Sequence, residues 1–147
     1  MREIKFRGKI KIQNEQKETR WVYGSIVHQT DFYGENVDRY FIIDGTCTED
    51  YEIGEAIEVS KETVGQYTGF VDENGKEIYE GDIVKTSKYG IDDGRENIYA
   101  GFDTFSVKFL DEEFCLINKW RRFNFRPLGG VEIIGNIYDN PELLGSD

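Results

Sequence analysis

Three carboxylates gather in one short stretch and raise the question of acid and base chemistry or cation binding. Glu77, Glu80 and Asp82 lie within the words KEIYEGDIV. Neighbouring carboxylates can exchange protons with a substrate, and their oxygens suit hard cations such as Ca²⁺ and Mg²⁺. Charged residues beside a tight turn are usually solvated, however, and an Asp after a glycine commonly accepts hydrogen bonds from nearby backbone amides. We favour the structural interpretation and predict no catalytic residue, metal site or cofactor.

A second acidic group lies in the loop-like segment 87–97. Asp92, Asp93 and Glu96 lack the full spacing of a calcium-binding loop. We therefore expect them to be solvated loop residues rather than metal ligands.

The nucleophile and base candidates are equally sparse. The two cysteines, Cys47 and Cys115, are too few for a disulfide framework or a thiolate zinc site. They are expected to be small buried thiols of a reducing cytosol. His28 is the single histidine, and it has no Ser or Cys nucleophile at a recognisable motif spacing. The sequence therefore predicts that the protein is not an enzyme.

Basic and aromatic residues interleave in the segment NKWRRFNFR, residues 118–126. Cations for phosphates beside rings for base stacking are the ingredients of a nucleic-acid groove. The same alternation describes a strand with one face in the core, and Asp111 to Glu113 could neutralise the bases. We expect partner contact or a structural role here, with nucleic-acid contact as the alternative. The candidate contact residues are Lys119, Trp120, Arg121, Arg122 and Arg126.

The charge of the chain is large and unevenly distributed. A formal net charge of -11 opposes a surface that neutralises phosphates throughout. Residues 1–20 carry seven bases against three acids, whereas residues 31–58 carry nine acids and the one base Arg39. A basic end and an acidic middle could pair within one chain or between copies. No apolar run approaches the ~18 residues of a membrane span, and the start MREIKFRGK has no apolar signal region, so we expect a cytoplasmic protein that does not bind membranes.

These residues must be positioned by β-strands. The first strand alternates, with Ile4, Phe6, Gly8, Ile10 and Ile12 on one face and charged residues on the other, and this pattern predicts a half-buried strand, either a protected edge or one offered to a partner. A second strand should form a hairpin with the first, across which Trp21 and Tyr23 pack. Asn74-Gly75 is the strongest hairpin signal of the chain. The predicted strands are 4–12, 21–27, 37–43, 70–71, 78–79, 83–86, 98–110, 114–117 and 131–138.

Two short helical turns complete the expected elements. Ser60 is a candidate N-cap for residues 61–63, and Asn140 with Pro141 marks a C-terminal turn. Short strands without long helical patterns predict an all-β, mainly antiparallel fold, either a small barrel or a sandwich. Gly81 to Val84 resembles the strand entry of SH3-like barrels, which places an SH3-like portion near residues 64–138. We expect one domain over 1–147, with an N-terminal hairpin region at 1–59 and a small barrel region at 60–147.

Five stretches of the sequence, read together, resemble a known family. They are MREIKFRGK, WVYG, ETVGQYTG, DENGKEIYEGDIV and EIIGNIYDNPELL, which run from the first residue nearly to the last. This combination resembles the YopX protein family of bacteriophages and prophages of Gram-positive bacteria. The family carries no established activity or catalytic residues, so the resemblance transfers none. Ser60-Lys61 departs from an Asp-Pro pair that is common at this place, and residues 10–18 and 87–97 look specific to this member.

The expected function follows from the charge segregation, the aromatic strands and the missing catalytic set. We predict a phage or prophage accessory protein that acts as a non-enzymatic protein-binding or assembly module. Its partner would be a second copy of itself or a phage or host protein. The alternative is a nucleic-acid-binding accessory protein that uses residues 119–126.

Overall fold

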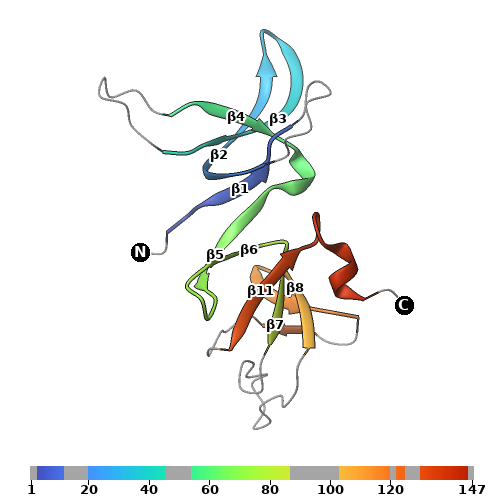
Figure 1. Ribbon diagram of the computed structural model, residues 1–147. Helices are drawn as coiled ribbons and strands as arrows, with labels where there is room; N and C mark the ends of the chain where they lie inside the picture. The colour runs from blue at the N-terminus through green and yellow to red at the C-terminus, as the bar shows by residue number, and fades with distance from the viewer. Residues whose placement is uncertain are drawn as a thin grey trace. The chain divides into compact units, whose positions relative to one another are not determined.

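The chain divides into two compact units, which are described separately. The computed structural model describes residues 3–11, 20–45, 54–86, 103–119, 122–124 and 130–145 (Figure 1). Unit 1 is Met1–Tyr67 and unit 2 is Thr68–Asp147, so the division falls inside strand β5, Gly65–Val71. The division expected between residues 59 and 60 lies earlier in the chain, just before a short helical turn.

Unit 1 contains most of a six-stranded sheet with the strand order β4-β3-β2-β1-β5-β6, of which the last strand, β6 (Glu77–Tyr79), belongs to unit 2. The end of β1 also returns to β4 through a bridge between Ile10 and Val59, which curls the sheet. The hairpin of β2 and β3 is the longest part of the unit. β2 is longer than β1, its other neighbour in the sheet, and β3 is longer than β4. The elements are β1 (Phe6–Lys9), β2 (Trp21–Phe32), β3 (Glu35–Ile43), β4 (Ala56–Val59) and the 3₁₀ helix η1 (Lys61–Thr63).

The core of unit 1 lies on one face of this sheet. Val22, Ile42 and Val59 are buried together from three strands, and Phe6 and Ile26 pack against them. Alternate residues along each strand point to the same face, so the β2 and β3 residues between these positions lie on the other face.

The first strand corrects one expectation and confirms another. β1 lies between β2 and β5, so it is neither a protected edge nor a strand free for a partner. Arg7, expected on a solvated face, is 5% exposed because the ring of Trp21 covers its guanidinium group, whose carbon lies 4.4 Å from the ring centroid. Tyr23 stands opposite Arg7 in the β1–β2 ladder, as the hairpin prediction requires.

Unit 2 contains the second sheet and the predicted Asn74-Gly75 hairpin. Gly75 has a φ of +80° and donates its backbone N–H to the carbonyl of Asp72 at 3.0 Å, so the hairpin prediction is confirmed. The described strands of the second sheet follow the order β10-β9-β8-β7-β11. The elements are β6 (Glu77–Tyr79), β7 (Asp82–Thr86), β8 (Asp103–Leu110), β9 (Glu113–Ile117), β10 (Arg122–Asn124), β11 (Val131–Asn136) and the 3₁₀ helix η2 (Pro141–Leu144).

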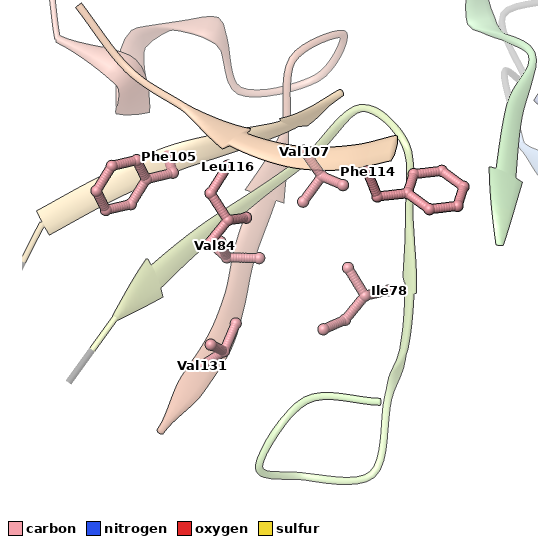
Figure 2. Close-up of a cluster of buried hydrophobic side chains, with 7 residues drawn as sticks. All are labelled: Ile78, Val84, Phe105, Val107, Phe114, Leu116 and Val131. Atoms are coloured by element: carbon pink, nitrogen blue, oxygen red, sulfur yellow. The ribbon is translucent and has the colours of Figure 1, made fainter. Parts of the chain in front are cut away.

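The core of unit 2 forms where β6 faces the five-stranded sheet. Figure 2 shows Val84, Val107 and Leu116 close together on neighbouring strands, with Ile78 of β6 pointing toward them. Phe105 packs edge-on against Phe123, with ring centroids 5.6 Å apart. The opposite face of these strands is also covered, since Ile83 and Cys115 are buried there.

The fold class follows from these sheets. The predicted all-β, mainly antiparallel fold with two helical turns is confirmed. Among the described residues the strands form open sheets without a closed barrel, which fits the sandwich alternative. Ser60 and Asn140 hold the N-cap positions, but neither side chain caps its helix. The carboxamide oxygen of Asn140 instead accepts the backbone N–H of Asn136, at 3.3 Å.

Candidate interaction surface

The three candidate carboxylates accept hydrogen bonds from backbone and side-chain groups of unit 2. Asp82 is buried rather than solvated, and its Oδ2 accepts the N–H of Tyr79 at 2.8 Å. Glu77 Oε2 accepts the hydroxyl of Tyr79 at 2.7 Å, and Glu80 Oε2 accepts the N–H of Phe109 at 3.3 Å. Within the described ranges no three His, Cys, Asp or Glu residues group to hold a metal ion. Asp82 accepts a hydrogen bond from a nearby backbone amide, as expected.

Asp72 is a further buried acid that the sequence reasoning missed. Only 5% of its surface is exposed, and its Oδ1 accepts the N–H groups of Asn74 and Lys76, both at 2.9 Å. Its Oδ2 accepts the N–H of Ile133 from β11 at 3.1 Å. Burial raises the pKa of Asp72, but the backbone hydrogen bonds, first that of Ile133, outweigh burial and hold the pKa below its ordinary value. An Asp two residues before Asn-Gly is the local signal for this role.

The basic and aromatic segment is described only in part. Arg122 Nη2 forms an ion pair with Asp111 Oδ2 at 2.7 Å, and this hydrogen bond raises the pKa of Arg122. Phe123 packs against the core of unit 2, and Lys119 is exposed. This pairing is the neutralisation expected from residues 111–113. Trp120, Arg121 and Arg126 lie outside the described residues.

The structure describes some of the remaining candidate residues and not others. Cys115 is a buried free thiol, as expected. Cys47 and the acidic group in residues 87–97 lie outside the described residues. His28 stacks on Tyr40 of β3, with ring centroids 4.2 Å apart.

The face of the unit 1 sheet opposite the core carries an unusual set of side chains, and we call it the outer face. A sheet with one buried face normally presents polar residues on the other. Here Tyr23 and Val27 are exposed apolar residues on that face. The registers of β1 to β4 place these residues on the outer face: Arg7, Lys9, Trp21, Tyr23, Val27, Arg39, Phe41 and Glu58.

Cations lie over the aromatic rings of the outer face. The Lys9 Nζ is 5.5 Å from the centroid of Trp21, and the guanidinium carbon of Arg39 is 5.0 Å from that of Phe41. A cation above a ring is attracted by the negative potential of the ring face. The outer face is therefore both aromatic and basic.

Glu58 fixes the cations at the centre of this face. Its carboxylate receives two hydrogen bonds from Arg39, at 3.1 and 3.0 Å, and lies 3.5 Å from the Lys11 Nζ. The Arg39 hydrogen bonds lower the pKa of Glu58 although burial opposes them. A fork-to-fork pair of this kind holds the guanidinium group in one orientation.

The far end of the β2–β3 hairpin projects from the sheet, and we call residues 29–38 the arm (Figure 1). The β1 ladder on β2 ends at Gly24, and the β4 ladder on β3 begins at Tyr40. Between these points the named strands β2 and β3 pair only with each other. The arm is therefore a two-stranded extension of the sheet.

The tip of the arm is aromatic and solvent-exposed. Phe32 is 46% exposed and Tyr33 is 93% exposed, with their rings edge to face at 4.7 Å. Tyr33 and Gly34 have φ values of +50° and +84°, which suit a two-residue hairpin turn. The tip therefore presents two adjacent exposed aromatic rings at the end of a projecting hairpin.

Charged contacts hold the base of the arm. Asp38 accepts a hydrogen bond from Lys61 of η1, and its Oδ1 lies 2.7 Å from His28 Nε2. These contacts, Lys61 first and His28 second, lower the pKa of Asp38. Asp31 and Glu35 are the other charged residues of the arm, which has no Lys or Arg. The arm is therefore acidic, in contrast to the outer face.

The arm itself was missed at the sequence level. The predicted strands 21–27 and 37–43 stop short of it because residues 28–36 are mostly polar and read as a connection. The available signal was Tyr33-Gly34, which lies between the polar runs 28–31 and 35–36 and is a typical turn position.

Comparisons with known proteins cover nearly the whole chain. Residues 5–145 match the sequence profile of the family described as YopX protein. The fold is similar to the crystal structure of protein EF1440 from Enterococcus faecalis, with a TM-score of 0.50 and 24% sequence identity over 96% of this chain and 97% of that chain. At this identity the likeness shows the fold alone. No curated protein matches the sequence significantly. No helix in the described part of the chain is long and apolar enough to cross a membrane.

Proposed function

The chain belongs to the YopX protein family, and from this premise we propose that it is a non-enzymatic protein-binding module. It acts as a phage or prophage accessory protein in the cytoplasm of the bacterial host. The observation that carries the proposal is the arm, whose exposed tip residues Phe32 and Tyr33 extend beyond the rest of the sheet.

The physical argument is the cost of exposing these rings. Large aromatic residues bury much apolar area and dominate the energetics of protein interfaces. Phe32 and Tyr33 make an edge-to-face contact with each other while both remain exposed. Their burial against a partner would recover the hydrophobic free energy that the isolated chain forgoes. The contacts of Asp38 with His28 and Lys61 fix the base of the arm, so that its tip is positioned before the partner binds.

Protein contact is favoured over nucleic-acid contact. The arm is acidic and would repel phosphates. In residues 118–126, Arg122 is already paired with Asp111. These charges support a protein partner for the arm.

Removal of the two tip rings tests the proposal. We expect F32S/Y33S to weaken partner binding by about 2 kcal/mol or more, roughly 30-fold, because central aromatic residues dominate interface energies. The measurement is quantitative mass spectrometry of polypeptides that co-purify with tagged protein from a Gram-positive host, with a second, differently tagged copy co-expressed.

The matched control is F70S/V71S, which changes an adjacent pair of exposed apolar residues in unit 2. The proposal expects at least one polypeptide to be retained by the wild type and by this control and lost with the tip variant. Identical recovery with all three proteins contradicts it.

A further inference from the structure

The arm and the outer face of unit 1 are complementary in charge and in apolar character. The arm presents Asp31 and Glu35 beside its two exposed rings. The outer face presents Lys9, Lys11 and Arg39 beside exposed apolar residues such as Val27. Complementary potentials of this kind select a partner and fix its orientation.

We propose that the partner of the arm is a second copy of this chain, whose outer face receives it. This inference rests on the proposed function, because it names the occupant of the same contact surface. Each arm lies across the outer face of the other copy, so that its acids meet the cations and its rings meet Tyr23 and Val27.

The arm cannot make this contact within its own chain. It continues the same β2 and β3 strands whose middle residues form the outer face. A two-stranded ladder that runs beyond its sheet cannot fold back on that sheet without breaking the ladder at the register shift between Gln29 and Asp31. A second copy meets no such restriction.

Pairing between two arms is disfavoured. Side-by-side arms would bring Asp31 and Glu35 of both copies together, and like charges in neighbouring strands repel. Exchange of arms between two outer faces instead satisfies a two-fold axis. Each contact then occurs twice and the assembly closes as a dimer.

Sedimentation equilibrium of the full chain tests this inference. We expect a monomer–dimer equilibrium with a Kd of about 10 μM or tighter at about 0.1 M salt. The affinity is expected to fall at least tenfold at about 1 M salt, where the Debye length shortens from about 10 to about 3 Å. A wild type that stays monomeric at about 100 μM overturns the inference. Tip-dependent capture of a different polypeptide would then still leave the proposed function standing.

Charge exchange distinguishes arm exchange from any other dimer. D31K/E35K makes the arm basic. K11E/V27E introduces two carboxylates at exposed positions and cancels the positive charge of the outer face, while Arg39 keeps its bidentate contact with Glu58. Each variant alone is expected to dimerise at least tenfold more weakly than the wild type. An equimolar mixture should form the mixed dimer more tightly than either variant dimerises alone, because the acidic arm meets an unchanged basic face and the basic arm meets the two introduced carboxylates.

Circular dichroism checks that both variants are folded. If K11E/V27E does not fold, K11E alone replaces it, with the same direction of effect. Variants that dimerise like the wild type, or a mixture that stays monomeric although the wild type dimerises, overturn the inference.

Discussion

Replacing Gly24 with alanine is expected to unfold unit 1. A Cβ atom built on Gly24 lies 1.9 Å from the carbonyl oxygen of Ile43 and 2.7 Å from its carbonyl carbon. Both atoms are backbone, so no side chain can move aside. Gly24 also has a φ of +154°, a conformation that L residues rarely adopt. We expect the free energy of unfolding to fall by about 4 kcal/mol or more, which is in the range of the most damaging single substitutions.

The control is a nearby glycine that has room. Gly45 has a φ of +75° but nothing within 4 Å of an added Cβ, so Gly45→Ala should cost only about 1 kcal/mol. Urea unfolding of both variants, followed by tryptophan fluorescence, measures the difference. If G24A and G45A lost equal free energy of unfolding, the close approach of β2 to the end of β3 would not determine the stability of unit 1.

The second large effect is expected in unit 2, from Asp72→Ala. The substitution leaves the N–H groups of Asn74, Lys76 and Ile133 without their carboxylate acceptor. Each unsatisfied buried donor costs about 1–3 kcal/mol, although water can reach the turn residues, so we expect a total of about 3 kcal/mol. The matched control is Glu73→Ala, an exposed neighbour that should change stability by less than about 0.5 kcal/mol. Hydrogen exchange of β11 amides measures both, and equal protection in the two variants would contradict the account.

The pH dependence of unit 2 follows from the same carboxylate. The folded pKa of Asp72 lies below its unfolded value of about 3.9. The unfolded chain therefore binds the proton more readily, and the stabilisation is present above that value and lost as the pH falls through the folded pKa. The wild type should lose more stability below about pH 4 than D72A does.

Local turn chemistry made parts of the fold predictable. Asn74-Gly75 and the start of β7 near Asp82 were recognisable because a positive φ and a short polar acceptor leave a mark in adjacent residues. The alternation of Phe6, Gly8 and Ile10 likewise indicated the face of β1 that meets the core. These signals need only a few neighbouring residues.

Long-range pairing accounts for what could not be predicted. Arg7 looked like a solvated residue because nothing in its neighbourhood shows that β5 and the ring of Trp21 come to lie beside it. The carboxylate of Asp72 reaches Ile133, which is distant in sequence. The acidic middle segment was visible as a charge pattern, but its projection as an arm depends on where β1 and β4 stop pairing with the hairpin.

The claim that the arm tip contacts another polypeptide is tested most directly by site-specific photocrosslinking. A benzophenone amino acid replaces Tyr33, and in a parallel sample it replaces Glu132, an exposed residue of β11. Irradiation of living host cells should give a discrete crosslinked polypeptide from position 33, either a second copy or another protein, and little from position 132. No crosslink at position 33 above that at position 132 would contradict the protein-binding function.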